Sequence, residues 1–179
     1  TYSSIFMNKN GDKFTTTYSD LKAGIPGFTT DDGKDFWFFI IAKDADNNEL
    51  NYTKNQNTPF KGYVVDNDPP VPVGNGGGRD IYVYANQPFT IYGNFTDNVG
   101  VEGVKVYLWK EGSSMIRNAE LIKQDENHFS ITYAELRNAL YLFDTSDGKD
   151  YRYYLHAQDE AGNIYNLSEG DGLFEIFVS

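Results

Sequence analysis

The chain has 179 residues, a formal net charge of −11 at pH 7 and no cysteine. The negative charge excludes a surface that binds nucleic acid or anionic membranes, which needs clustered Lys and Arg, and the lack of cysteine excludes disulfides, thiolate zinc sites and cysteine nucleophiles. Hydrophobic residues make up 40% of the chain and aromatic residues 16%, so a core can form, and the many Tyr and Phe favour β-strands. No apolar run reaches the roughly 18 residues that a transmembrane helix needs, so no membrane insertion of this segment is expected.

The first 66 residues are expected to form part of an all-β module. Strands are predicted at residues 3–7, 13–18, 35–44 and 60–65. The strand at residues 35–44 has Phe36, Phe38, Ile40 and Ala42 on one face and Trp37, Phe39 and Ile41 on the other. Apolar side chains on both faces are typical of a strand that is covered on both sides.

A complete seven-stranded module is expected at residues 71–179, after a stiff linker at residues 67–70 whose two prolines restrict the backbone. The first predicted strand combines residues 71–73 and 81–84, and the others are residues 89–95, 104–110, 119–123, 128–132, 151–159 and 173–178. One or two helical turns are expected within residues 134–142. Seven short strands separated by turn signals predict a Greek-key β-sandwich.

An internal repeat relates the two parts. When the sequence is shifted by 115 positions, residues 14–54 align with residues 129–169 without a gap. Of the 41 aligned positions, 14 are identical, whereas composition alone gives about two or three. The identities include Phe14 with Phe129, Leu21 with Leu136, Asp44 with Asp159, and the run Asp-Gly-Lys-Asp at residues 32–35 and 147–150. A period this long indicates duplicated modules and not a solenoid.

The first module lacks its N-terminal strands, because no residues of the chain align with the first three strands of the second module. The remaining strands would leave an open edge and an apolar surface, which favours aggregation. Three sources of cover are considered: a cleaved upstream segment that stays attached, strands donated by a neighbouring molecule, or residues 2–7 of the chain itself. We expect strands from outside the chain.

Three stretches carry a family resemblance: Asp68-Pro69-Pro70, residues 95–108 (FTDNVGVEGVKVYL) and residues 153–163 (YYLHAQDEAGN). They resemble the immunoglobulin-like and fibronectin type III-like modules of bacterial and archaeal surface proteins. The resemblance implies two tandem Greek-key β-sandwich modules in an extracellular cell-surface protein. It implies a non-catalytic structural or adhesive role, with neighbouring modules of the same or another surface chain as partners. The alternative is a carbohydrate-binding accessory module of a secreted hydrolase or protease, with glycans as partners.

No catalytic residues are expected, and the chain is not predicted to be an enzyme. The two histidines, His128 and His156, are not accompanied by a serine in a nucleophile motif, and no glycine-rich phosphate loop precedes a helix pattern. No cofactor is expected apart from calcium. Calcium is favoured by oxygen ligands on loops, and the candidate ligands are Asp66, Asp68, Asp97 and Asp159. The alternative for these residues is ordinary turn capping by Asp and Asn.

A binding patch is the other candidate site. Tyr107 and Trp109 share the outward face of one predicted strand, and Tyr154 and His156 share that of its expected neighbour. Flat aromatic side chains stack on sugars or anchor protein contacts, although packing against a neighbouring module is the alternative. Three sequons also make Asn51, Asn94 and Asn166 candidate glycosylation sites.

Overall fold

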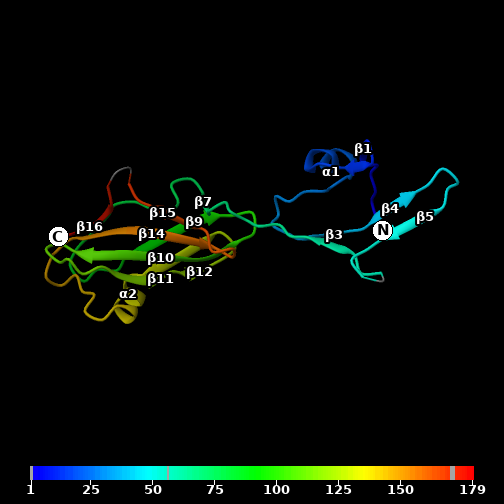
Figure 1. Cartoon of the computed structure of the whole chain (residues 1–179). Coiled ribbons are helices and arrows are strands. Elements are labelled where there is room, and N and C mark those ends of the chain that lie inside the picture. Colours follow the sequence, from blue (N-terminus) through cyan, green and yellow to red (C-terminus); the bar gives the residue numbers. More distant parts are fainter. Residues whose placement is uncertain (1, 56, 170–171) are drawn as a thin grey trace. The chain divides into compact units, whose positions relative to one another are not determined.

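The computed structural model describes residues 2–55, 57–169 and 172–179. The chain divides into two compact units, unit 1 (Thr1–Val65) and unit 2 (Asp66–Ser179), which are labelled by element in Figure 1. In both units the regular secondary structure is mostly β-strand, with one short helix each, α1 (Tyr18–Gly24) and α2 (Tyr133–Ala139). Within the described ranges, no helix has the length and apolar character needed to cross a membrane.

Unit 2 contains two β-sheets. A six-stranded sheet has the order β11 (Arg117–Glu120), β10 (Val101–Lys110), β14 (Tyr151–Asp159), β16 (Phe174–Val178) and β8 (Ile81–Val83), and β15 (Ile164–Leu167) also pairs with β14. A four-stranded sheet has the order β12 (Ile122–Lys123), β13 (His128–Thr132), β9 (Thr90–Thr96) and β7 (Val71–Pro72). All pairs are antiparallel except β16 with β8.

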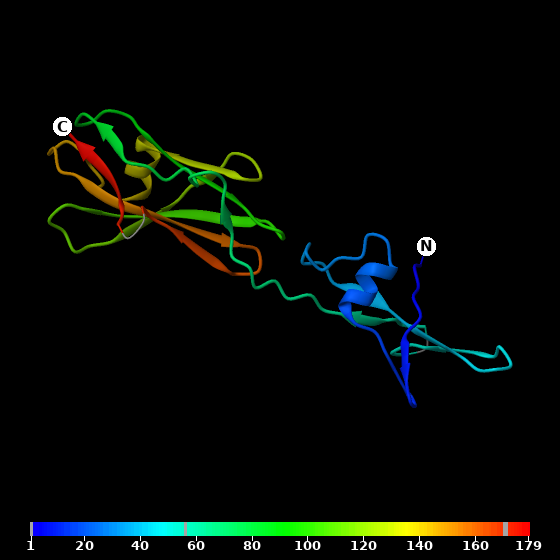
Figure 2. The same cartoon turned by 90° about the horizontal axis from the view of Figure 1, so that it is seen from above.

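The core of unit 2 is formed by alternate residues of both sheets, which appear as two layers in Figures 1 and 2. Side chains of a strand point alternately to its two faces, and the predicted apolar faces of β10 and β14 are confirmed as buried. The buried residues of these strands are Val101, Val104, Val106, Leu108, Tyr151, Tyr153, Leu155, Ala157 and Asp159. From the other sheet come Ile91, Phe95, Phe129 and Ile131, and α2 adds Leu136.

Unit 2 has more strands than the predicted seven. Two of the predicted strands are each divided into two shorter strands that lie in different sheets, and one further strand was not predicted. The strand expected at residues 119–123 breaks at Leu121, so that β11 pairs with β10 and β12 pairs with β13. Leu121 itself is buried, and its N–H donates to the Val104 carbonyl at 2.8 Å. In the same way β7 and β8 lie in different sheets, and β15 adds a tenth segment. The apolar pattern of a strand indicates which of its faces is buried, but it does not indicate the strand with which it pairs.

Unit 1 is built from three separate antiparallel strand pairs. These are β1 (Asn8–Asn10) with β2 (Lys13–Thr15), β3 (Phe36–Phe38) with β6 (Phe60–Gly62), and β4 (Ile40–Lys43) with β5 (Glu49–Tyr52). No residue in the described part of unit 1 is buried. The strand predicted at residues 3–7 does not form, and the one predicted at residues 13–18 ends early because Thr17 caps α1.

The shift of 115 positions found in the sequence is preserved in the secondary structure of the two units. Helices α1 and α2 begin and end at equivalent residues, and so do strands β5 and β15. The register of β4 with β5 is also equivalent, because Ile40 pairs with Tyr52 in unit 1 and Leu155 pairs with Leu167 in unit 2. The strand predicted at residues 35–44 is divided into β3 and β4, whereas the equivalent β14 is continuous, and β1 pairs with β2 in a register that differs by one residue from that of β12 with β13. The helix and the β4–β5 hairpin are therefore the parts of the repeat that recur in both units.

Candidate metal site

Three carboxylates of unit 2 come together in space. Asp66, Asp97 and Asp159 each offer an oxygen atom within 4.8 Å of the other two. Asp66 is the first residue of unit 2, Asp97 directly follows β9 of the four-stranded sheet, and Asp159 ends β14 of the six-stranded sheet. The cluster therefore joins both sheets to the start of the unit.

Turn hydrogen bonds orient two of these carboxylates. The Asp97 Oδ1 atom accepts the backbone N–H groups of Val99 at 2.9 Å and Gly100 at 3.3 Å. At Asp159, the Asn163 backbone N–H donates to Oδ1 and the Asn163 side-chain amide donates to Oδ2, both at 2.8 Å. Asp and Asn side chains commonly hold turns in this way. Both carboxylates are thus held by their own turns.

Asp66 differs from the other two carboxylates in having a buried oxygen atom without a partner among the described residues. Its Oδ1 atom accepts the Asn98 side-chain amide at 3.3 Å, and its backbone carbonyl accepts the Asn163 side-chain amide at 3.2 Å. Its Oδ2 atom is buried and has no hydrogen-bond partner among the described residues. A buried polar atom left without a partner costs about 1–3 kcal/mol, and more when it is charged. A cation bound to Asp66 Oδ2 would supply the partner that this oxygen lacks.

The electrostatics of the cluster point to a cation. Two unit negative charges 4.8 Å apart repel by on the order of 3–4 kcal/mol at an effective dielectric constant of about 20. None of the ion pairs formed within the described residues involves Asp66, Asp97 or Asp159, and the Asp159 side chain is fully buried. An all-oxygen set on loops and strand ends suits calcium, which takes six to eight oxygen ligands from carboxylates, carbonyls and water.

The fourth predicted calcium ligand, Asp68, lies outside the cluster. Its side chain is exposed, and its backbone N–H donates to Asp66 Oδ1 at 3.3 Å. Asp68 therefore follows an Asp-capped turn, as the alternative interpretation expected. Sequence reasoning did not include Asn98 and Asn163 in the site, although both follow a predicted Asp within four residues and could have been found by their turn-forming spacing.

Three of the four predicted patch residues meet on the outer face of the six-stranded sheet. Tyr107 and Tyr154 are directly cross-strand, with stacked rings 5.0 Å apart and 4° from parallel. The His156 ring centroid lies 5.5 Å from that of Tyr107, and His156 Nδ1 is 2.9 Å from Asn166 Oδ1. Trp109 lies on the same face, cross-strand from Arg152, and all four patch residues are half-buried.

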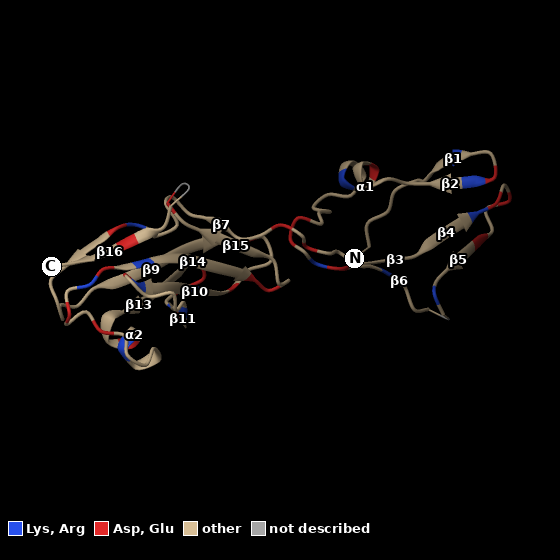
Figure 3. Cartoon of the chain, turned by 60° about the vertical axis from the view of Figure 1, so that its left-hand side comes forward, with Lys and Arg blue, Asp and Glu red and all other residues tan. Residues whose placement is uncertain are grey.

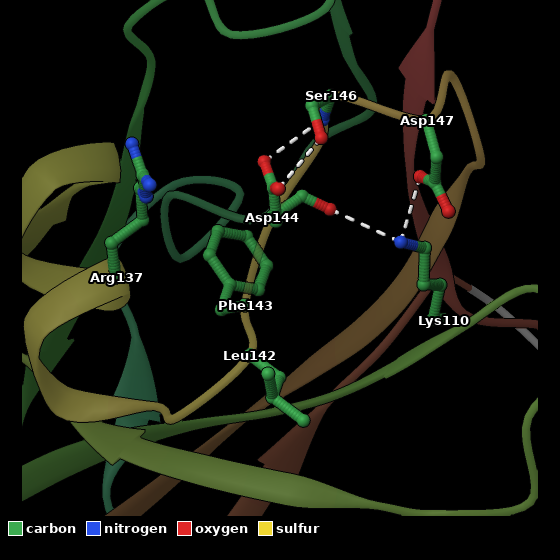
Figure 4. A pocket seen from close by; sticks show the side chains of 7 residues that line it. All are labelled: Lys110, Arg137, Leu142, Phe143, Asp144, Ser146 and Asp147. Carbon is green, nitrogen blue, oxygen red and sulfur yellow. Dashed lines mark hydrogen bonds and ion pairs between the residues drawn. The ribbon is translucent and has the colours of Figure 1, made fainter.

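Two surface pockets also lie in unit 2, the smaller of them beside the aromatic patch. One of about 170 Å³ is lined by Glu102, Gly103, Lys105, Glu120, His156 and Gln158. A larger one, of about 450 Å³, is drawn in Figure 4 and is lined by Lys110, Arg137, Leu142, Phe143, Asp144, Ser146 and Asp147. In the larger pocket Lys110 Nζ pairs with Asp147 Oδ1 at 2.7 Å, and this contact holds the Asp147 pKa below its ordinary value. Of the two cations that line this pocket, Lys110 is therefore already paired with a carboxylate.

The three candidate glycosylation residues lie on strands. Asn51 on β5 and Asn166 on β15 are exposed and occupy equivalent positions of the repeat, whereas Asn94 on β9 is half-buried. Asn166 also contacts His156 of the aromatic patch. Figure 3 shows that acidic residues are spread over both units, mostly in loops and at strand ends.

No family model and no curated protein matches the chain. Among solved structures, it is similar to the crystal structure of an engineered protein from the Northeast Structural Genomics Consortium, with 16% sequence identity and a TM-score of 0.37. The similarity covers 56% of this chain and 18% of that protein. These comparisons assign no family, and the mainly β architecture rests on the strand pairing of the chain itself.

Proposed function

We propose that this chain is a non-catalytic, extracellular segment of a structural or adhesive cell-surface protein, built from tandem immunoglobulin-like or fibronectin type III-like β-sandwich modules, and that unit 2 binds calcium. The observation that carries the calcium proposal is the meeting of Asp66, Asp97 and Asp159 within 4.8 Å, with Asp66 Oδ2 buried and unpaired in the described structure. The two facing sheets of unit 2 and the repeated elements of unit 1 support the tandem-module proposal.

Calcium would act on the folding of unit 2. The three ligands belong to the first residue of the unit and to the ends of one strand from each sheet. A cation held by all three offsets their mutual repulsion and ties these segments together. Since the unfolded chain does not keep the three carboxylates close, the ion stabilises the folded state by mass action, by about 2.7 kcal/mol when its free concentration is 100 times the dissociation constant.

A calcium titration tests this proposal. Protein freed of metal with EDTA is expected to unfold several degrees higher in millimolar calcium, as followed by circular dichroism. Asp97→Asn should abolish the increase, because it removes one of the three charges. Asp68→Asn is the matched control and should keep the increase, because Asp68 is exposed and outside the cluster. An unchanged melting temperature at millimolar calcium would leave turn capping as the role of these residues.

A carbohydrate-binding accessory module is the second candidate function. It is favoured by the parallel stack of Tyr107 on Tyr154, with Trp109 on the same face of the sheet. Flat aromatic surfaces bind the apolar faces of sugar rings. Glycan-array or polysaccharide pull-down binding that is lost in both Trp109→Ala and Tyr154→Ala would support this function. The exposed aromatic residue Tyr84 provides the control substitution Tyr84→Ala, which should leave such binding intact.

A further inference from the structure

Unit 1 exposes side chains whose equivalents form the core of unit 2. The Phe14 side chain is 57% exposed, whereas that of its equivalent Phe129 is 1% exposed. Phe38 is 42% exposed, whereas its equivalent Tyr153 is fully buried. The helix and one hairpin of the repeat are equivalent in the two units, so we attribute the difference in burial to the elements that cover these residues in unit 2.

Two strands of unit 2 provide that cover. Strand β9 pairs with β13, placing Gly93 opposite Phe129, and β10 pairs with the whole of β14, placing Leu108 opposite Tyr153. In the described part of unit 1, β2 pairs only with β1, β3 only with β6, and β4 only with β5. Unit 1 therefore has two free strand edges, one equivalent to the β9 edge and one equivalent to the β10 edge.

We propose that unit 1 is completed by a polypeptide segment that supplies two strands of the β9–β10 kind. The occupant is a segment that precedes β1 in chain order, as β9 and β10 precede β12 and β13 in unit 2. One strand adds antiparallel to β2 and the other antiparallel to β3 and β4, in the register of the equivalent pairs. Apolar side chains at every second position of both strands close the core over Phe14 and Phe38.

The chain's own N-terminal residues do not take this place. Residues 3–7 form no strand, and the Phe6 side chain is fully exposed. Tyr2 makes a ring contact with Phe39 at 5.4 Å but remains 86% exposed. Unit 1 thus retains unpaired backbone groups at strand edges next to apolar side chains, the combination that favours strand addition.

A gap-free chimera tests the proposal. Residues 71–128 are placed directly before residues 14–179, because residue 129 is equivalent to residue 14. Hydrogen exchange by mass spectrometry is measured for β3 and β4, with size-exclusion light scattering on the same samples. We expect a monomer in which β3 and β4 exchange about 100-fold or more slowly than in the 179-residue chain, since they gain a strand partner and a core. The control chimera carries Val104→Asp and Val106→Asp in the added copy only and should lose this protection.

A second experiment tests the proposal even if the chimera does not fold. A synthetic peptide of residues 89–111 is added to the 179-residue chain and should slow exchange in β2, β3 and β4 while leaving β14 unchanged. Three results would overturn the proposal. These are protection of β3 and β4 equal to that of β14 in the monomeric 179-residue chain, protection that appears only on self-association of that chain, and no gain of protection with either the chimera or the peptide.

Discussion

Helix α1 of unit 1 and helix α2 of unit 2 have the same capping box and the same kind of C-terminal cap. Thr17 and Asp20 exchange side-chain to backbone hydrogen bonds at the start of α1, and Thr132 and Glu135 do so at the start of α2. Yet α1 has no buried residue, whereas α2 buries Tyr133 and Leu136. Capping is decided by residues three apart in sequence, while burial is decided by strands tens of residues away.

Equivalent turns of the two units also share their backbone conformation. Asn47 has φ of 65° and its equivalent Gly162 has φ of 94°, so both adopt left-handed backbone, which Asn tolerates better than most residues. Gly27 has φ of 79°, and its equivalent Leu142 has φ of 67°. Leu142 keeps the conformation although a left-handed backbone costs a non-glycine residue about 1–2 kcal/mol. The rest of the turn therefore holds it there.

The largest expected difference between the units is in the cost of deleting a core leucine. Leu136→Ala should destabilise unit 2 by about 2–5 kcal/mol, because Leu136 is fully buried and its loss leaves a cavity. The melting temperature of unit 2 should fall by roughly 10 °C or more. The equivalent Leu21→Ala should have a much smaller effect, because Leu21 is only half-buried. Thermal and urea unfolding measure both, and equal losses would contradict the difference in packing.

The next largest effect concerns the acidic turns. Asp44 and Asn48 in unit 1 repeat the geometry of Asp159 and Asn163, with the same two hydrogen bonds of 2.8 Å. Within the part of the chain that the structure describes, Asp159 has two further carboxylates beside it and Asp44 does not. Asp159→Asn should therefore remove the calcium stabilisation of unit 2, about 2–3 kcal/mol at 100 times the dissociation constant.

The matched variant for this prediction is Asp44→Asn, which should leave the calcium response unchanged. Isothermal titration calorimetry should give one calcium ion per chain for the native protein and for Asp44→Asn. A second ion that depends on Asp44 would contradict the view that this turn alone is insufficient as a site.

The sequence predicted the parts of this structure that depend on periodicity and turn chemistry. The alternation in β10 and β14 identified their buried faces, and the Asp residues after β9 and at the end of β14 identified two members of the carboxylate cluster. The choice between Asp66 and Asp68 was beyond the sequence, because either could have turned inward from a polar linker. The structure turns Asp66 inward and leaves Asp68 exposed.

Elements were missed where the partner decides the structure. Strand β15 forms because Ile164–Leu167 pairs with β14, which a four-residue segment does not specify alone. The change of sheet at Leu121 depends on the geometry at the edge of both sheets. Helix α1 was missed for a different reason. The capping residues Thr17 and Asp20 are visible in the sequence, but the preceding alternation favoured a longer strand.

A smaller effect is expected at the strained turn. Leu142→Gly should stabilise unit 2 by about 0.5–1 kcal/mol, because glycine adopts a positive φ without a steric penalty and the Leu142 side chain is 69% exposed. Leu142→Ala is the control, since it shortens the same side chain but keeps the Cβ atom, and it should give no gain. Urea unfolding distinguishes the two variants. Equal stabilities would mean that the left-handed backbone of Leu142 carries no strain.

The smallest effect, and the most direct check on local equivalence, is the titration of the two capping carboxylates. Hydrogen bonds from the Thr17 backbone and side chain hold the pKa of Asp20 below its ordinary value, and those from the Thr132 backbone and side chain do the same for the pKa of Glu135. A lowered pKa means that each ionised carboxylate stabilises its helix start above the unfolded pKa. For Glu135 this contribution is complete above about pH 4.5 and is lost as the pH falls through the lowered value.

Carboxyl carbon NMR should find both pKa values depressed, and Glu135→Gln should flatten the acid side of the stability profile of unit 2. An ordinary pKa for Asp20 beside a depressed one for Glu135 would show that α1 needs the missing core in order to form, and the two units would then differ in local structure as well as in burial.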